Sequence, residues 1–272
     1  MAIGYFTRLR AGVVTPTGGN WRAALPASNM LTPERAAVAR STTAATTDTK
    51  VSFPLGAAYS LRLLGLDAVN FTSAAQVRWS IGTSAFDTSI YAGSWTNWLQ
   101  ATGVETAITE HGASLGADFP SFEVLSSTAT GCTHVNLEID DHANPAGYVD
   151  VGFAFAGQAL VPEINPEYGS WGDGHDDLST KTRGYAGQLW SDPNRRMRKV
   201  ELSLSALTEA EAITLHEIQR VLGTVGPLAF VPDIADAPKS QRYGFFGTLR
   251  TLGVLENPEY ARRGNAFAME QG

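Results

Sequence analysis

Between Asp48 and Val161 apolar side chains recur mostly at every second position, the period of strands that bury one face. Five segments alternate most clearly, and they are Lys50–Phe53, Tyr59–Leu63, Gln76–Ile81, Thr133–Ile139 and Tyr148–Phe153. Turn-forming spacers separate them, namely Pro54–Gly56, Ser94–Asn97 and Asp140–Gly147. Short alternating strands with such spacers predict a β-sandwich or barrel.

The C-terminal third of the chain combines strands with one helix. Alternation over Arg198–Leu204 predicts a strand with one buried face. Thr208 and Glu211 then form a capping box, which predicts a helix over about residues 208–222 that ends before Gly223. The apolar stripe expected on this helix consists of Ile213, Leu215, Ile218, Val221 and Leu222. Further strands are expected at Pro227–Val231, Gln241–Arg250 and Tyr260–Met269.

Charge distribution supports a division of the chain near residue 180. No Lys or Arg occurs in the 102 residues between Arg78 and Lys181, a stretch that holds fourteen Asp and Glu. Residues 1–180 carry a net charge of −9, whereas residues 181–272 carry +2. The segment 165–177 is rich in Gly and Asp, as loops are. We therefore expect a β-sandwich with an N-terminal arm over residues 1–168, a linker over 169–180 and a β-rich unit over 181–272.

The same composition argues against several classes of protein. A long acidic region is a poor surface for nucleic acid, because phosphate contacts need clustered Lys and Arg. The longest apolar run, Val149–Val161, is too short and too polar to cross a bilayer. The N-terminal residues lack the apolar stretch of a secretory signal, so we expect synthesis in the cytoplasm. Cys132 is the sole cysteine, which excludes an intrachain disulfide.

Catalytic and metal-binding motifs are weak in this sequence. Residues 112–116 match the G-x-S-x-G pattern around Ser114, but Pro120 would break the helix that a nucleophile elbow needs. Asp173, His175, Asp176 and Asp177 are potential metal ligands, yet the spacing of a calcium-binding loop is absent and a solvated acidic linker is the favoured interpretation. We therefore expect a protein that is not an enzyme and holds neither metal nor cofactor.

Two groups of residues are candidates for binding. Aromatic and amide side chains in the turn-rich stretch around residue 95 could stack on a sugar and hydrogen-bond its hydroxyls, while the alternative is that the two tryptophans close the end of the sandwich. This group consists of Tyr91, Trp95, Asn97 and Trp98. The second group is the main basic cluster, a candidate subunit interface with the acidic region of a neighbouring copy. Its members are Arg195, Arg196, Arg198 and Lys199.

Several of these segments together resemble known families. Four segments resemble a discoidin or galactose-binding-like jelly roll, namely Lys50–Gly56, Leu61–Leu66, Val77–Gly82 and Tyr148–Gly152. The segments Arg195–Gly223, Pro227–Asp233 and Phe267–Glu270 resemble tail-tip proteins of long-tailed bacteriophages. The order of the two blocks is similar to that of minor tail or distal-tail-like baseplate proteins.

The resemblance implies a jelly-roll β-sandwich followed by a smaller, mainly β unit with one helix. It also implies a virion structural protein of a tail tip or baseplate, which forms a ring of identical subunits and contacts the tube, hub and tape measure proteins. The alternative is a carbohydrate-binding module that contacts a glycan on the host surface. Neither nucleic-acid binding nor membrane insertion is expected.

Overall fold

A computed structural model describes residues 1–100, 119–166, 171–185, 187–192, 194, 196–254, 256–259 and 262–272. It divides the chain into two compact units. Unit 1 comprises Met1–Val161 and Pro227–Phe246, and unit 2 comprises Pro162–Gly226 and Gly247–Gly272. The chain is mainly β, as the alternating patterns predict. Among the described residues, no helix is both long and apolar enough to span a bilayer.

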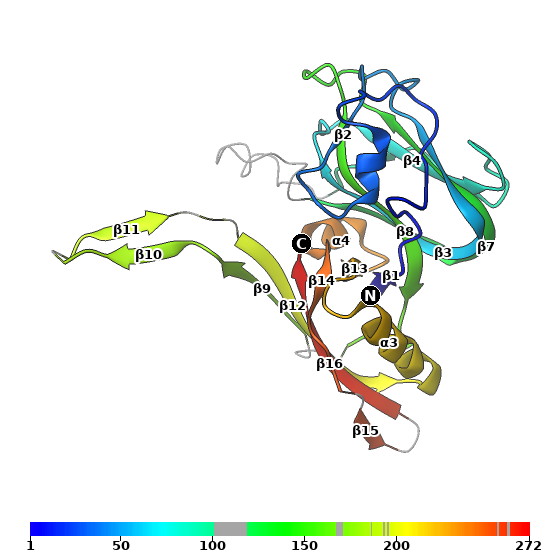
Figure 1. Ribbon diagram of the computed structural model, residues 1–272. Coiled ribbons are helices and arrows are strands. Elements are labelled where there is room, and N and C mark those ends of the chain that lie inside the picture. Colours follow the sequence, from blue (N-terminus) through cyan, green and yellow to red (C-terminus); the bar gives the residue numbers. More distant parts are fainter. Residues whose placement is uncertain are drawn as a thin grey trace. The chain divides into compact units, whose positions relative to one another are not determined.

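Unit 1 is built on antiparallel strands that follow the order β5-β4-β7-β3-β8-β1-β13, with β6 beside β4 and β2 beside β8. Figure 1 labels the longer strands β3, β4, β7 and β8 of this unit. The strands are β1 (Ala2–Tyr5), β2 (Ala39–Arg40), β3 (Val51–Val69), β4 (Gln76–Gly82), β5 (Tyr91–Ala92), β6 (Thr96–Asn97), β7 (Ser121–Asp140), β8 (Asp150–Leu160) and β13 (Leu228–Val231). A 3₁₀ helix, η1 (Ala27–Leu31), and a short helix, α4 (Ala237–Tyr243), complete the unit.

The core of unit 1 contains the apolar positions of the alternating segments. Val77, Trp79 and Ile81 of β4 are almost fully buried, whereas the intervening Gln76 and Arg78 are half-buried. From Gln76 to Trp79 this is the burial pattern that a period of two predicts for a strand with one covered face, whereas Ser80, on the same side as Arg78, is also buried. A second apolar cluster, around Phe153 and Phe155 of β8, packs against Phe246.

Strand β3 is longer than its sequence predicts. A turn is expected at Pro54–Gly56, but β3 continues through it to Val69, and its register with β7 shifts between Pro54 and Tyr59. Gly56 has a φ of 77°, which a residue without a side chain adopts without strain. The turn-forming residues thus produce an irregularity within one bent strand.

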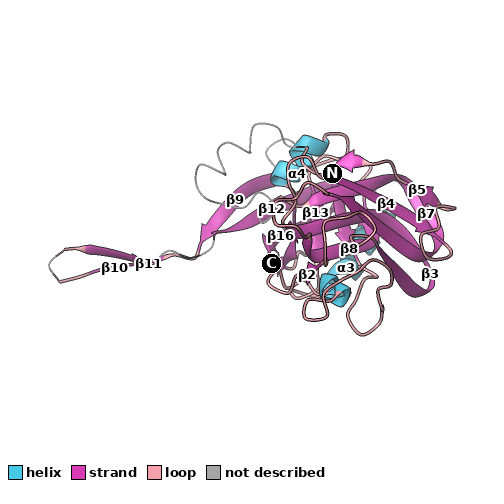
Figure 2. Cartoon of the chain, turned by 90° about the horizontal axis from the view of Figure 1, so that it is seen from above, coloured by secondary structure: helices cyan, strands magenta, loops and turns pink. Residues whose placement is uncertain are grey.

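Unit 2 contains a curved antiparallel sheet, one helix and a separate hairpin. The sheet follows the order β14-β16-β12-β9, with β15 beside β16. Its strands are β9 (Trp171–Asp177), β12 (Arg196–Leu207), β14 (Phe245–Thr251), β15 (Glu256–Glu259) and β16 (Arg262–Gln271), and the division between the units falls within β14. Strands β10 (Thr180–Arg183) and β11 (Leu189–Asp192) form a two-stranded sheet of their own, seen as a thin ribbon in Figure 2.

The predicted helix is α3 (Glu209–Leu222), and its capping box is present. Thr208 accepts a hydrogen bond from the Glu211 amide, and the Glu211 carboxylate accepts one from the Thr208 amide. The buried stripe differs from the predicted one, because Ile213 and Val221 are each 53% exposed. The residues that face the interior are Ala212, Leu215, Ile218, Gln219 and Leu222.

The structure differs from the expected organisation in three places. The expected linker over residues 169–180 contains β9, which pairs with β12 along its whole length from Trp171 to Asp177. Residues 227–246 belong to unit 1, where β13 pairs with β1. The start of the strand expected at Gln241 is helical instead, because the Asp236 side chain caps α4 at the Lys239 amide and a proline occupies its first turn.

Candidate functional site

The candidate site lies on the outer face of β4, where two cross-strand rows of polar side chains meet. Register places Arg78 opposite Glu138 of β7, and Gln76 opposite Asp140. On the other side of β4, Gln76 lies opposite Asn97 of β6. Neighbouring positions such as Val77 and Ile139 point inward and are buried, so the polar positions share the outer face. The β4 polar face is Gln76, Arg78, Trp95, Asn97, Glu138 and Asp140.

Arg78 is the centre of this face. Its Nε donates a hydrogen bond to Glu138 Oε2 at 2.6 Å, and its guanidinium lies over the Trp95 ring, 4.8 Å from the centroid. The guanidinium therefore joins an ion pair to a cation–π contact, and both fix the orientation of the half-buried indole. This geometry places a partly exposed aromatic ring beside charged hydrogen-bonding groups.

The second row supplies amides and a carboxylate. Gln76 Nε2 donates to Asn97 Oδ1 at 3.2 Å, and Asn97 is exposed. Asp140 Oδ1 lies 2.8 Å from Nδ1 of His142, which is itself mostly exposed. The Asp140 carboxylate raises the pKa of His142, and the hydrogen bond from His142 lowers the pKa of Asp140. The face thus presents donors and acceptors within one row of the sheet.

The four residues predicted to bind sugar occupy different environments. Trp95 and Asn97 lie on the β4 polar face. Trp98 is 1% exposed, its indole N–H donates to the Thr72 carbonyl, and its ring packs edge-on against Phe71 with centroids 5.7 Å apart. The sequence left two interpretations open for the tryptophans, sugar binding or closure of the end of the sandwich. Trp98 fits the second. Its ring therefore offers no surface to a ligand.

Tyr91 is engaged elsewhere. Its hydroxyl donates a hydrogen bond to the carboxylate of Glu123 on β7. Burial raises the pKa of both groups, and the neighbouring carboxylate raises the pKa of Tyr91 further. The pair is a partly buried contact between β5 and β7 rather than part of the β4 polar face.

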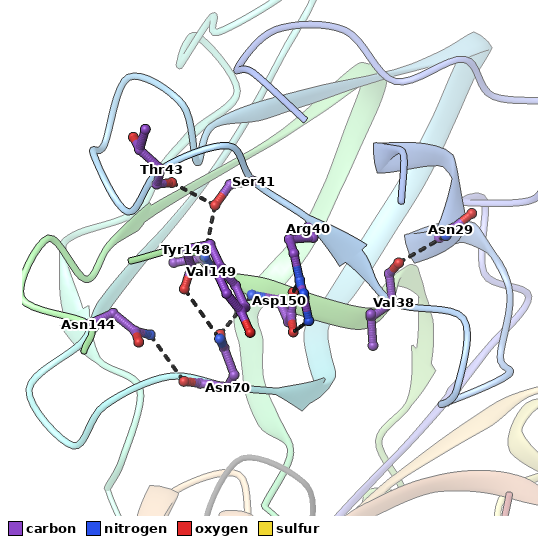
Figure 3. Close-up of polar contacts among 10 residues, drawn as sticks. All are labelled: Asn29, Val38, Arg40, Ser41, Thr43, Asn70, Asn144, Tyr148, Val149 and Asp150. Atoms are coloured by element: carbon purple, nitrogen blue, oxygen red, sulfur yellow. Dashed lines mark hydrogen bonds and ion pairs between the residues drawn. The ribbon is translucent and has the colours of Figure 1, made fainter. Parts of the chain in front are cut away.

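A polar network secures the loops at the end of unit 1 where β7 ends and β8 begins (Figure 3). Asn70 Nδ2 donates to the Tyr148 carbonyl, and Asn70 Oδ1 accepts from the Asp150 amide at 2.7 Å. Arg40 binds Asp150 through two hydrogen bonds of 2.7 and 2.8 Å, and its guanidinium lies 3.9 Å from the Tyr148 ring centroid. These contacts join the loops to each other, so we interpret the network as structural.

Basic residues predicted to form a subunit interface lie at the start of β12, opposite β9. Arg196 Nε lies 3.9 Å from Asp177, and Lys199 Nζ lies 3.0 Å from Asp176. Asp176 also pairs with Arg250 at 2.5 Å. Arg198 lies opposite His175 in the register of the two strands, and Arg195 lies outside the described residues.

These pairings place the acidic cluster and the basic cluster of the sequence on adjacent strands of one sheet. Lys199 and Arg250 lower the pKa of Asp176. Hydrogen bonds from Ser179, followed by the charge of Arg196, lower the pKa of Asp177. No group of three or more His, Cys, Asp or Glu able to hold a metal occurs within the described parts of the chain. Ser114 lies outside the described residues.

Sequence reasoning missed four members of the β4 polar face, namely Gln76, Arg78, Glu138 and Asp140. Alternation identifies each of them as an outward position of its own strand. Their common location depends on the register of β4 against β6 and β7, which joins segments about 20 and 60 residues apart. The sequence signal for the Arg78–Glu138 pair was an outward Arg in one strand and an outward Glu in another. Many different strand pairings would be consistent with that signal.

No family model and no curated protein matches the sequence. Among solved structures, the family 32 carbohydrate-binding module of Clostridium perfringens NanJ in complex with galactose is 8% identical, with a TM-score of 0.39 over 57% of this chain and 98% of that one. A CBM32 module from Clostridium perfringens in complex with GalNAc-β-1,3-galactose is 11% identical, with a TM-score of 0.38 over 54% of this chain and 97% of that one. A Streptococcus pneumoniae fucose binding module is 9% identical, with a TM-score of 0.36 over 56% of this chain and 95% of that one.

Proposed function

We propose that unit 1 binds a glycan through the β4 polar face. The observation that carries this proposal is the half-buried indole of Trp95, held by Arg78 beside Asn97 and the Arg78–Glu138 ion pair. A sugar ring presents C–H groups on one face and hydroxyl groups at its edge. An aromatic surface next to an amide and a carboxylate matches both features.

The ion pair prepares the face for such a ligand. Glu138 and Arg78 hold each other in place, so little side-chain entropy is lost when a sugar hydroxyl contacts them. Asn97, which is exposed, supplies both a donor and an acceptor. The ligand class that fits is a neutral hexose unit of a glycan, because Arg78, the cation of the face, is already paired with Glu138.

The test is a glycan array with the full chain, followed by calorimetric titration with the best ligand. Trp95→Ala should weaken binding by at least about tenfold, a loss of about 1.4 kcal/mol. Val225→Ala is the control, because it removes an exposed apolar side chain from unit 2 and should leave the affinity unchanged. A wild-type chain that binds no glycan, or a Trp95→Ala variant with wild-type affinity, would overturn the proposal.

The role in a phage tail tip that the sequence resemblance implies is a second proposal. An exposed hairpin in unit 2, described below, supports a protein that works through contacts between chains. Antibody labelling of purified virions should place the protein at the end of the tail distal to the head. Its absence from intact particles would refute this role.

We also propose that the protein binds without catalysis. Two of the acidic side chains of β9 that the sequence offered as metal ligands, Asp176 and Asp177, are engaged in ion pairs with Arg196, Lys199 and Arg250. The remaining catalytic candidate is Ser114. Activity-based probes for serine hydrolases should leave the full chain unlabelled, and labelling that disappears in Ser114→Ala would contradict the proposal.

A further inference from the structure

Unit 2 carries an exposed hairpin, here called the arm, which consists of β10, β11 and the flanking residues Leu178, Ser179 and Tyr185. Its two strands pair only with each other among the described residues. The base is closed by Ser179, whose hydroxyl accepts from the Asn194 amide at 2.9 Å. Every described residue of β10 and β11 is exposed. An isolated two-stranded hairpin is only marginally stable in water, so the arm gains stability if it packs against something.

Large apolar side chains are concentrated on the arm. Trp190 is 65% exposed and Leu189 is 56% exposed, and Tyr185 and Leu178 are exposed as well. Register pairs Trp190 with Thr182 on one face, and Leu189 with Arg183 on the other. Single exposed apolar residues are ordinary, but four on one short hairpin are typical of an interaction surface.

The same unit contains a hollow of about 770 Å³ on the outer face of its sheet. Its floor contains the small residues Ser203, Ala266 and Ala268, with Glu201 beside Ala268 in the pairing of β12 with β16. Trp171 of β9 and Arg250 of β14 line its sides. Small side chains in register on a sheet face leave room for a large side chain from outside.

We propose that the arm of one copy docks in the hollow of a second copy, with Trp190 over the small-residue floor. Arg183 and Glu201 support this choice of partner. Arg183 on the arm forms no ion pair with a described residue, and the exposed Glu201 at the hollow likewise forms none. Contact between copies pairs these two charges while it covers the apolar residues of the arm.

The arm can reach the hollow of its own copy only if the chain reverses its direction after β9. Strand β9 leads from Trp171, at the hollow, to Asp177, where the arm begins. Six steps of strand span about 20 Å at about 3.3 Å per residue. The arm continues from the far end of β9 and β12, and the Ser179–Asn194 contact fixes this exit. A neighbouring copy supplies the hollow instead.

Arm and hollow are different surfaces, so the contact is heterologous. Repetition of a heterologous contact links copies head to tail, into a ring if the rotation closes and into a filament if it does not. This inference is independent of the glycan proposal, because the arm and the hollow both belong to unit 2 and the β4 polar face belongs to unit 1. Self-association and glycan binding can therefore fail separately.

Cysteine cross-linking tests the contact. Full-length Trp190→Cys and Ser203→Cys variants are mixed at high concentration under mild oxidation. The mixture should form a disulfide-linked dimer that neither variant forms alone. Native Cys132 is fully buried and does not interfere. Val225→Cys, an exposed position of unit 2 outside both surfaces, replaces Trp190→Cys as the matched control and should give no cross-link with Ser203→Cys.

Charge reversal provides a second, equilibrium measurement by sedimentation velocity over a concentration series. Arg183→Glu and Glu201→Arg should each weaken self-association by at least about tenfold, because each places like charges in contact. A mixture of the two variants should recover association, because it restores one native contact. Three results would overturn the proposal: no cross-link in the mixture, a Trp190→Cys variant that links only to itself, or a wild-type chain that binds lipid vesicles or another protein through the arm and never itself.

Discussion

Replacement of Trp98 by alanine separates the two tryptophans that the sequence treats alike. Trp98 is 1% exposed, and its side chain packs against Phe71 and donates to the Thr72 carbonyl. Removal of a buried tryptophan costs about 3–5 kcal/mol, which includes the cavity that remains. The edge-on ring contact is worth about 0.5–1.5 kcal/mol and the hydrogen bond about 1 kcal/mol, and both losses fall within that range. We expect Trp98→Ala to destabilise unit 1 by about 4 kcal/mol.

Trp95→Ala should cost much less. Its indole is half-buried and its named contact is the Arg78 guanidinium, so about 0.5–1 kcal/mol is lost. Trp98→Phe is the conservative variant, because it keeps an aromatic ring in the core but leaves the Thr72 carbonyl without its donor. About 1–2 kcal/mol is expected for that change.

Hydrogen exchange of peptides from unit 1 in a urea series measures these differences without interference from unit 2. For a urea dependence of about 3 kcal/mol per molar, Trp98→Ala should lower the midpoint by about 1.3 M and Trp95→Ala by about 0.3 M or less. At the same time Trp95→Ala should lose glycan affinity, whereas Trp98→Phe should keep it. A Trp98→Ala variant with wild-type stability and no glycan binding would refute the assignment of Trp98 to the core.

Three further predictions follow from the local contacts. The pKa of His142, measured by NMR, should lie above its ordinary value and fall in Asp140→Asn. The stability that this raised pKa contributes is complete below about pH 6.5 and is lost as the pH rises through the folded pKa. A stability that increases over this pH range would contradict the ion pair. Thr208→Ala should destabilise unit 2 by about 1 kcal/mol in the same urea assay, with Thr214→Ala on the exposed face of α3 as the control. Burial raises the pKa of the Cys132 thiol, so a thiol reagent should label it only after unfolding, and rapid labelling of the native protein would disprove its burial.

The sequence by itself determined the features that depend on neighbouring residues. Alternation over Gln76–Ile81 and Thr133–Ile139 identified strands and their buried faces, and the Thr208–Glu211 capping box located α3 within one residue. Each of these signals lies within a few residues of the element that it specifies. Local sequence is sufficient there because side-chain direction and capping hydrogen bonds are local properties.

Only the tertiary structure decided which elements meet. The alternation of β4 does not determine which strand lies beside it. A shift of one residue in the register of β4 against β7 would move Arg78 away from Glu138 and Trp95. Likewise the turn-rich composition of Gly172–Asp177 predicts a loop, yet pairing with β12 supplies backbone hydrogen bonds and cationic partners that hold it as β9. Trp95 and Trp98 differ for the same reason. Long-range pairing, and not the residue types, determines whether an aromatic ring lies in the core or on the surface.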